Sequence, residues 1–286
     1  MKTKLLLTGM ISAFILNVYC QSDNFQSEKL VKLWEVKGME VPESVQPVLS
    51  ENKIYVSNIA SPSPVDKDST GYISILSFDG KILTQKWATG LNAPKGMGII
   101  GGSLFVTDID RIAEIDLKTG KIIKFYAVDG AQFLNDIAVT SEDILFITDS
   151  KAKKVYKFDH GKISTVVESD DYPFLNGIIF ADRKILVGTG KNIISIDPKT
   201  DEAKAYIENT GGIDGFAQLG PKNYIFSDWS GIIHCIEEGK EKELLLDTSK
   251  LEKTQSADFG YCKEKNTIYV PTFFGNSIVC YQLKDK

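Results

Sequence analysis

Two stretches of the chain, "LNDIAVTSEDILFITD" (Leu134–Asp149) and "LNGIIFADRKILVGT" (Leu175–Thr189), share one pattern that decides the fold. Each begins with a polar residue inside an apolar run, continues as an apolar strand, turns, and returns as a second strand rich in Ile, Leu, Val and Phe. Such residues favour β-strands, and the polar turn between the runs favours an antiparallel pair. We therefore predict two strand pairs, each opening on an asparagine, Asn135 or Asn176.

The same pattern occurs six times along the chain. The other four copies are "PESVQPVLSENKIYVSN", "PKGMGIIGGSLFVTD", "IDGFAQLGPKNYIFSD" and "ADFGYCKEKNTIYVPT". A third strand follows each pair and a fourth follows all but the last, as in "KVYKFDHG" and "KISTVVES", joined by the "DG", "KTG" or "HG" turns typical of tight hairpins. Repeats of about 40 residues with four antiparallel strands indicate propeller blades. The sequence therefore predicts an all-β fold, a six-bladed β-propeller with four strands per blade.

The last repeat ends after its third strand, at "NSIVCYQLKDK". The missing fourth strand has a counterpart near the other end of the chain, where "KLVKLWEV" (Lys29–Val36) resembles the fourth strands of the earlier repeats. We therefore expect the N-terminal strand to complete the last blade and to close the ring.

Length and composition are those of an ordinary globular protein. The chain has 286 residues, of which 43% are hydrophobic and 25% charged, without the polar excess of a disordered chain. We expect one propeller domain over residues 21–286 and an export signal over residues 1–20.

The export signal is predicted from Lys2 and Lys4, which precede an apolar run from Leu5 to Tyr19 that is short for a membrane span. Cleavage after Cys20 would release a periplasmic or secreted protein. The alternative is a lipoprotein acylated at Cys20, although Asn17 and Tyr19 suit such a site poorly.

Charge and cysteine content limit the partners. Loss of Lys2 and Lys4 takes the formal net charge from −5 to −7, and an acidic chain without a basic tract argues against nucleic acid. We expect a monomer that takes a small-molecule ligand and has no transmembrane segment in the mature chain. Cys235, Cys262 and Cys280 allow at most one internal disulfide, and burial in strands explains them equally.

The first strand of each propeller blade lines the central channel, so the polar residues that open these strands should form a ring. These residues are Glu43, Lys95, Asn135, Asn176, Asp214 and Asp258, and successive members lie 38 to 52 residues apart.

The second strand runs back antiparallel to the first, so the loops that leave the second strands should surround the ring. These loops carry the predicted substrate-mouth residues, which with Asp258 are Asn58, Asp108, Asp149, Asp228, Trp229, Phe273 and Phe274. An insertion over Ile59–Thr70 is long enough to act as a lid.

The ring offers oxygen ligands for a metal. Glu43 and Asp214 supply carboxylates, and Asn135 and Asn176 supply amide oxygens. Hard oxygen donors suit Ca²⁺ first and then Mg²⁺ or Mn²⁺, and the absence of Cys and His from the ring disfavours the usual zinc site, although we keep Zn²⁺ among the possible ions. The alternative is a polar channel that holds only water.

The motifs "PESV", "FLND", "FLNG" and "GIDG", each at the start of an inner strand, resemble the senescence marker protein/gluconolactonase (regucalcin-like) family, in its secreted bacterial branch. The resemblance extends over the mature chain. It implies one divalent cation on Glu43, Asn135, Asn176 and Asp214, and hydrolysis of lactones or related esters. In that chemistry the metal polarises the carbonyl and Asp214 is also the general base.

Lys95 departs from the ring of oxygen donors. Its ammonium could pair with Glu43 or Asp258, could stabilise an oxyanion as a second catalytic group, or could replace the metal. His160 and His234 should lie far from the ring, which disfavours a histidine-based lactonase. Trp229, Phe273 and Phe274 could stack on a ligand or pack between blades.

Two other functions fit the same sequence. One is a non-catalytic propeller that binds a small molecule, a carbohydrate or a protein through its channel-mouth loops. The other is an enzyme similar to strictosidine synthase, a condensing enzyme of similar fold. Fold alone does not choose between them.

Overall fold

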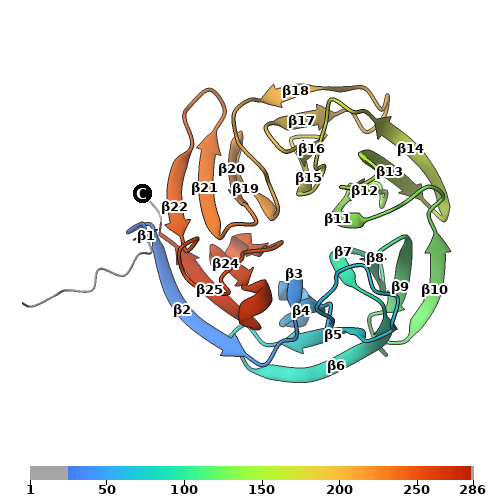
Figure 1. Ribbon diagram of the computed structural model, residues 1–286, viewed down its shortest axis with the longest axis horizontal. Coiled ribbons are helices and arrows are strands. Elements are labelled where there is room, and N and C mark those ends of the chain that lie inside the picture. The colour runs from blue at the N-terminus through green and yellow to red at the C-terminus, as the bar shows by residue number, and fades with distance from the viewer. Residues whose placement is uncertain (1–24, 285–286) are drawn as a thin grey trace, which may run out of the picture.

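The structure is a computed structural model that describes residues 25–284. The predicted export signal and the alternative acylation at Cys20 lie outside these residues. Figure 1 shows the sheets arranged around a central axis. There are six sheets, and each contains the four antiparallel strands of one blade. The predicted six-bladed propeller is therefore confirmed.

The first three blades follow the chain in order. Blade 1 contains β3 (Pro42–Val48), β4 (Lys53–Asn58), β5 (Gly71–Leu76) and β6 (Ile82–Leu91). Blade 2 contains β7 (Pro94–Ile100), β8 (Ser103–Asp108), β9 (Arg111–Asp116) and β10 (Ile122–Ala127). Blade 3 contains β11 (Leu134–Val139), β12 (Leu145–Asp149), β13 (Lys154–Asp159) and β14 (Lys162–Glu168).

The last three blades complete the ring. Blade 4 contains β15 (Ile178–Ala181), β16 (Lys184–Gly188), β17 (Ile193–Ile196) and β18 (Ala203–Ile207). Blade 5 contains β19 (Phe216–Gly220), β20 (Asn223–Ser227), β21 (Ile232–Glu237) and β22 (Glu243–Asp247). Blade 6 contains β23 (Gly260–Cys262), β24 (Thr267–Pro271), β25 (Ser277–Leu283) and β2 (Leu30–Lys37).

The ring closes as the sequence predicts. Strand β2 pairs antiparallel with β25, from Leu30 opposite Leu283 to Lys37 opposite Ser277, so an N-terminal and a C-terminal strand lie side by side in blade 6 (Figure 1). One pairing was not predicted. Strand β1 (Phe25–Gln26) adds a fifth strand to blade 5 beside β22.

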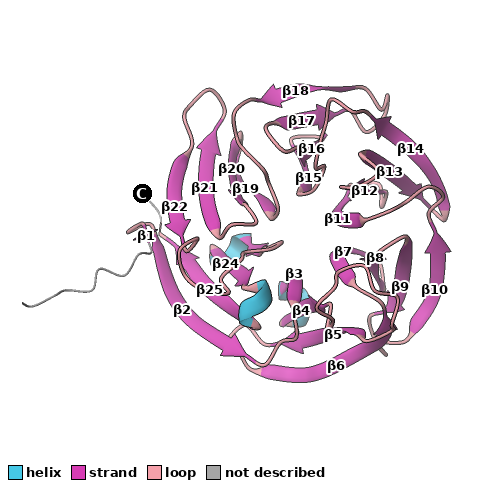
Figure 2. Cartoon of the chain, in the orientation of Figure 1, coloured by secondary structure: helices cyan, strands magenta, loops and turns pink. Residues whose placement is uncertain are grey.

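Helical structure is confined to short turns, as Figure 2 shows. Among the described residues these are the 3₁₀ turns η1 (Leu49–Glu51), η2 (Lys263–Lys265) and η3 (Phe273–Gly275). No helix within residues 25–284 has the length and apolar character needed to cross a membrane. Over the same residues no disulfide forms, and Cys262 and Cys280 are buried in strands.

Apolar side chains fill the space between neighbouring blades. Ile73 of blade 1 and Val106 of blade 2 belong to one buried cluster, and Val155 of blade 3 and Ile194 of blade 4 belong to another. Burial of such side chains stabilises the fold by about 1.5–3 kcal/mol each. The core therefore lies between the sheets, which leaves the axis for polar groups.

Three glycines allow the inner strands to approach one another near the axis. A Cβ added to Gly96 would lie 2.5 Å from the Cα of Asp136, and one added to Gly177 would lie 2.2 Å from the carbonyl oxygen of Asp214. At Gly215 the Cβ would lie 2.5 Å from Phe259. Each glycine directly follows a ring residue, so these close contacts fix the positions of the ring side chains.

We predict that Gly177→Ala lowers the free energy of unfolding by about 1–3 kcal/mol, because overpacking against backbone atoms forces the strands apart. Chemical denaturation measures the change. The matched control is Gly102→Ala, since no atom of residues 25–284 lies within 4 Å of its added Cβ. Equal stabilities of the two variants would contradict the prediction.

Candidate metal and substrate site

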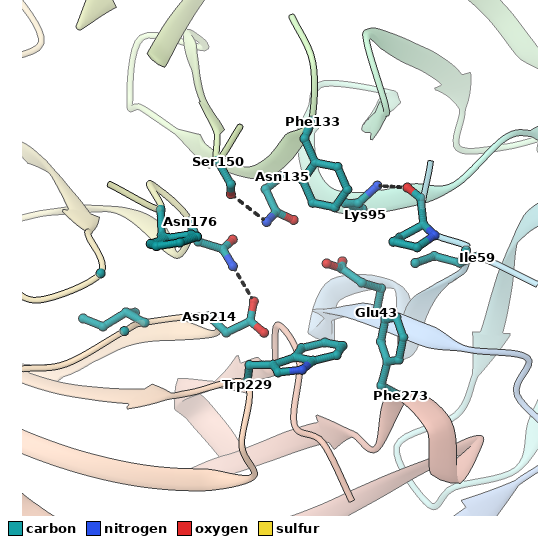
Figure 3. Close-up of a pocket in the computed structure, with 15 residues that line it drawn as sticks. Glu43, Ile59, Lys95, Phe133, Asn135, Ser150, Asn176, Asp214, Trp229 and Phe273 are labelled. Carbon is teal, nitrogen blue, oxygen red and sulfur yellow. Dashed lines mark hydrogen bonds between the residues drawn. The ribbon is translucent and has the colours of Figure 1, made fainter. Parts of the chain in front are cut away.

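A cavity of about 460 Å³ opens at the end of the channel where the inner strands begin. Five of the six predicted ring residues line it: Glu43, Lys95, Asn135, Asn176 and Asp214. Figure 3 shows the side chains of Glu43, Asn135, Asn176 and Asp214 converging on its centre. All except Asn176 are at most 5% exposed.

The two asparagines are held so that their amide oxygens face the cavity. Asn135 donates from Nδ2 to Ser150 Oγ at 3.1 Å, and Ser150 donates in turn to the carbonyl of Leu175 at 2.6 Å. Asn176 donates from Nδ2 to Asp214 Oδ1 at 2.8 Å. These bonds use the amide nitrogens and leave both Oδ1 atoms directed inward (Figure 3).

Three buried oxygens at the cavity lack hydrogen-bond partners among the described residues. They are Oε2 of Glu43, Oδ1 of Asn135 and Oδ1 of Asn176. An unsatisfied buried acceptor costs about 1–3 kcal/mol, so three in one cavity indicate that a group from outside the chain satisfies them. The donor set, all oxygen from carboxylate and amide groups, fits a hard divalent cation.

The carboxyl groups of the ring have strongly altered acidity. Burial raises the pKa of Glu43 well above its ordinary value, and the nearby charge of Asp214 adds to the effect. Burial, followed by the charge of Asp258, raises the pKa of Asp214 to about 7. In the absence of a cation these groups therefore stay protonated to a higher pH than ordinary carboxyl groups do.

Lys95 does not pair with a carboxylate within the described part of the chain. Its Nζ donates to the carbonyls of Pro64 and Ala93, both at 3.1 Å, and lies 4.4 Å from the ring centroid of Phe133. Burial lowers the pKa of Lys95, and the charge of Glu43 partly opposes this. Two of its three donors are fixed on backbone carbonyls, so one remains for the cavity.

The insertion Ile59–Thr70 reaches the site, as expected of a lid. Ile59 and Pro64 line the cavity, and the Pro64 carbonyl is one of the two acceptors of Lys95. Lys67 pairs with Asp110 at 2.5 Å and connects the insertion to the next blade. The insertion thus covers the side of the cavity where Lys95 lies.

Asp258 corrects the predicted ring. The blade 2 hydroxyl of Thr107 donates to the Asn135 carbonyl, and the corresponding blade 5 hydroxyl of Ser227 donates to the Ala257 carbonyl at 3.1 Å. Ala257 therefore occupies the ring level in blade 6, and Asp258 lies one residue deeper. There its Oδ2 accepts a hydrogen bond from Ser44 Oγ at 2.5 Å.

Several predicted mouth residues bind neighbouring backbone and side-chain groups and do not line the cavity. Asn58 contacts Glu40, Val56 and Ser74. Asp108 accepts from the amides of Asn92 and Ala93 at 2.8 Å and pairs with Arg111.

Asp149 and Asp228 also accept hydrogen bonds from backbone amides of their loops. Asp149 accepts from four amides, those of Gln132, Phe133, Lys151 and Ala152. Asp228 accepts from the amides of Ser230 and Ile232. These carboxylates order the loops that support the site and do not themselves line the cavity.

Aromatic side chains form one wall of the cavity. Trp229 and Phe273 line it with ring centroids 4.6 Å apart, whereas Phe274 packs on Phe273 at 4.8 Å and does not line it. Phe133 and Phe174 also line the cavity and were missed by the sequence reasoning, although "FLN" repeats in both stretches. Phe174 is 72% exposed and has φ +55°, a strained conformation that often occurs at functional sites.

Histidine does not contribute to the cavity. His160 is exposed in the turn between β13 and β14, and His234 stacks on Phe226 at 5.7 Å. Within the described residues no three His, Cys, Asp or Glu side chains come together as a metal cluster. Any cation at the ring therefore depends on the two asparagine oxygens as well as on the carboxylates.

Solved structures similar to this chain include two kinds of lyase. The chain is similar to virginiamycin B lyase from Staphylococcus aureus, which was solved with quinupristin as a catalytically inactive histidine-to-alanine variant. The two chains are 16% identical with a TM-score of 0.63, and the match covers 90% of this chain and 99% of the lyase. It is also similar to a streptogramin B lyase, with 15% identity, a TM-score of 0.59, and coverage of 90% and 100%. No family model and no curated protein matches the chain.

These similarities show the propeller fold at an identity too low to carry an activity. The resemblance to the gluconolactonase family remains a prediction from the inner-strand motifs. A histidine is needed for activity in the lyase, whereas neither histidine of this chain lines the cavity.

Proposed function

We propose that the protein is a divalent-metal-dependent hydrolase of lactones or related esters. The observation that carries this proposal is the set of three unpartnered, buried oxygens that Glu43, Asn135 and Asn176 direct into one cavity beside Asp214. Four oxygen donors from four different blades surround a space open to small molecules. This arrangement suits a bound cation with positions left for substrate.

The proposed ligands are Glu43, Asn135, Asn176 and Asp214. A divalent cation at this position would polarise the carbonyl of a bound ester and stabilise negative charge on its oxygen. The two asparagines are oriented for this task before binding, because Ser150 and Asp214 hold their amide groups. Ca²⁺ suits the donor set best, followed by Mg²⁺, Mn²⁺ or Zn²⁺.

Asp214 and Lys95 have the proposed catalytic roles. The raised pKa of Asp214, about 7, brings its proton affinity close to that expected of a general base at neutral pH. Asp214 would take a proton from the attacking water. Lys95 lies across the cavity from Asp214 (Figure 3), where its remaining N–H would stabilise charge on the substrate oxygen.

The walls of the cavity favour an apolar substrate. Around the polar floor, the lining is almost entirely carbon: Ile59, Pro64, Phe133, Phe174, Ile213, Trp229 and Phe273. A polyhydroxylated sugar would leave its hydroxyls without partners against this wall, which is unfavourable. We therefore propose lactones or esters with alkyl or aryl substituents.

The exposed aromatic cluster also suits a second function, a non-catalytic propeller that binds an apolar small molecule. Trp229 is 47% exposed and Phe274 is 44% exposed, and large exposed aromatics often mark binding sites. Binding without turnover, in protein whose metal content is measured, would favour this function. Condensation of an amine with an aldehyde in the presence of chelator would favour the enzyme similar to strictosidine synthase.

The test is hydrolysis of a lactone panel by chelator-treated protein, before and after addition of Ca²⁺, Mg²⁺, Mn²⁺ or Zn²⁺. We expect turnover only with a metal. We also expect at least a tenfold higher kcat/KM for alkyl- or aryl-substituted lactones than for sugar lactones, because unpaired sugar hydroxyls raise the activation free energy and an increase of about 1.4 kcal/mol lowers the rate tenfold. Elemental analysis gives the resident ion. Turnover unaffected by chelator, or no turnover with any of the metals, would contradict the proposal.

A further inference from the structure

A second cavity, of about 250 Å³, lies deeper in the channel. All six inner strands contribute to it, from β3, β7 and β11 to β15, β19 and the start of blade 6. Its acidic lining residues are Asp136 and Asp258. Asp136 directly follows Asn135, and Asp258 directly follows Ala257, so both lie one level below the ring that forms the first site.

Asp136 is buried, and its carboxylate has no direct partner in the described part of the chain. It is 3% exposed, and neither of its carboxylate oxygens has a hydrogen-bond partner within residues 25–284. Asp258 has one such contact, from the hydroxyl of Ser44 to Oδ2. A buried carboxylate without donors is strongly unfavourable, because the lost hydration is not replaced.

The surrounding chain offers little to neutralise these groups. At the same level, blades 2, 4 and 5 contribute Gly96, Gly177 and Gly215, which have no side chains. Within the described part of the chain, Asp136 has no partner for either oxygen, and the side-chain partner of Asp258 is the uncharged hydroxyl of Ser44. Lys95 lies at the upper level with two donors fixed on backbone carbonyls.

Charge along the channel supports the same conclusion. Glu43, Asp136, Asp214 and Asp258 are buried carboxyl groups, and Lys95 is the accompanying cation. If all are ionised, their charges sum to −3. One divalent cation at the upper ring would give that level a charge of +1, and the lower level would keep the −2 of Asp136 and Asp258.

We propose that Asp136 and Asp258 hold a second divalent cation in the lower channel, separate from the proposed catalytic ion. Two carboxylates with the Ser44 hydroxyl and water molecules form an oxygen donor set that suits hydrated Ca²⁺ or Mg²⁺. Both carboxylates line the same cavity, and neither oxygen of Asp136 has a hydrogen-bond partner among the described residues. The ion would join blades 3 and 6 across the axis and stabilise the ring.

The experiment counts Ca²⁺ bound to the full chain by equilibrium dialysis after chelator treatment. We expect two equivalents for the wild type, and one for Asp136→Asn and for Asp258→Asn. Blade 6 contributes no ligand to the proposed upper site, so Asp258→Asn separates the two sites. Asp129→Asn, at an exposed position, is the matched control and should keep two equivalents.

Thermal unfolding gives a second measurement, in which the difference in Tm between Asp136→Asn and the wild type should change sign when Ca²⁺ is added. In chelator, Asp136→Asn should raise Tm by about 2–4 °C because it removes an uncompensated buried charge. In Ca²⁺ the same variant should have a lower Tm than the wild type, because it loses the ion. A structural role without an ion would not reverse the sign.

The proposal would be overturned if both Asp136→Asn and Asp258→Asn still bound two equivalents of Ca²⁺. It would also be overturned if the wild type bound at most one equivalent and both variants bound the same amount. In those cases protons, not cations, neutralise the lower carboxyls. Failure of the proposed catalytic site has a different signature. Glu43→Gln would then leave the count unchanged while Asp136→Asn lowers it.

Discussion

Replacement of Glu43 by glutamine is expected to remove the proposed catalytic cation and to lower kcat/KM for lactone hydrolysis by about 10²–10³-fold, as loss of one preorganised electrostatic group does in other enzymes. The carboxylate of Glu43 is 5% exposed and its Oε2 has no partner among the described residues. Glutamine has nearly the same shape, but it carries no charge, and its NH₂ group would repel a cation. Activity assays and metal analysis of the purified variant measure both effects.

Stability measurements distinguish this loss from misfolding. Burial raises the pKa of Glu43 well above its ordinary value, so the ionised group destabilises the metal-free fold. Glu43→Gln should therefore have an equal or higher Tm than the wild type in chelator. Glu142→Gln, in the exposed turn between β11 and β12, is the matched control. Full activity and metal content in Glu43→Gln would contradict the assignment.

Most of the fold could be predicted from sequence because a propeller repeats its local signals six times. Closure was also predictable, since "KLVKLWEV" has the character of a fourth strand and the last repeat lacks one. The pairing of β1 with β22 was not, because Phe25 and Gln26 carry no periodic pattern. Two residues are too few to specify a strand without the neighbour that accepts their hydrogen bonds.

The predicted ring was wrong by one residue in blade 6. Aligning polar residues placed Asp258 level with Asp214, whereas the hydroxyl of Ser227 binds the carbonyl of Ala257 and fixes that residue at the ring level. Polarity does not distinguish two successive levels of a channel when both contain carboxylates. A hydroxyl near the end of a second strand, as at Thr107 and Ser227, is the better guide to register.

The polarity of a loop residue also does not show whether its side chain lines the cavity or binds the loop backbone. Asp108 and Asp149 end second strands, as residues at a substrate mouth would, yet both accept hydrogen bonds from loop amides. Aspartate is common in turns because its oxygens bind nearby backbone amides. The phenylalanines of "FLND" and "FLNG" were the better signal, because a large apolar residue repeated beside a polar ring residue forms the cavity wall.

Two carboxyl groups of the channel give a second large prediction, which concerns stability in the absence of metal. Burial raises the pKa of Asp214 and of Asp258 from 3.8 to about 7. Between about pH 4 and pH 7 the folded protein therefore binds more protons than the unfolded chain. The resulting stabilisation is complete below about pH 4 and is lost as the pH rises to about 7, with a slope of about 1.4 kcal/mol per pH unit for each group.

We therefore expect the Tm of metal-free wild type to fall relative to that of Asp214→Asn as the pH rises from 4 to 7, because only the wild type must ionise this buried group. The comparison cancels surface carboxyls, which both proteins share. Addition of Ca²⁺ should reverse the trend, since a cation at the ring stabilises the ionised carboxylate, so the Tm gained with Ca²⁺ should grow toward neutral pH. Thermal unfolding of both proteins at several pH values, with chelator and with Ca²⁺, measures these differences. A pH-independent difference between the two would show that Asp214 ionises as freely in the folded protein as in the unfolded chain.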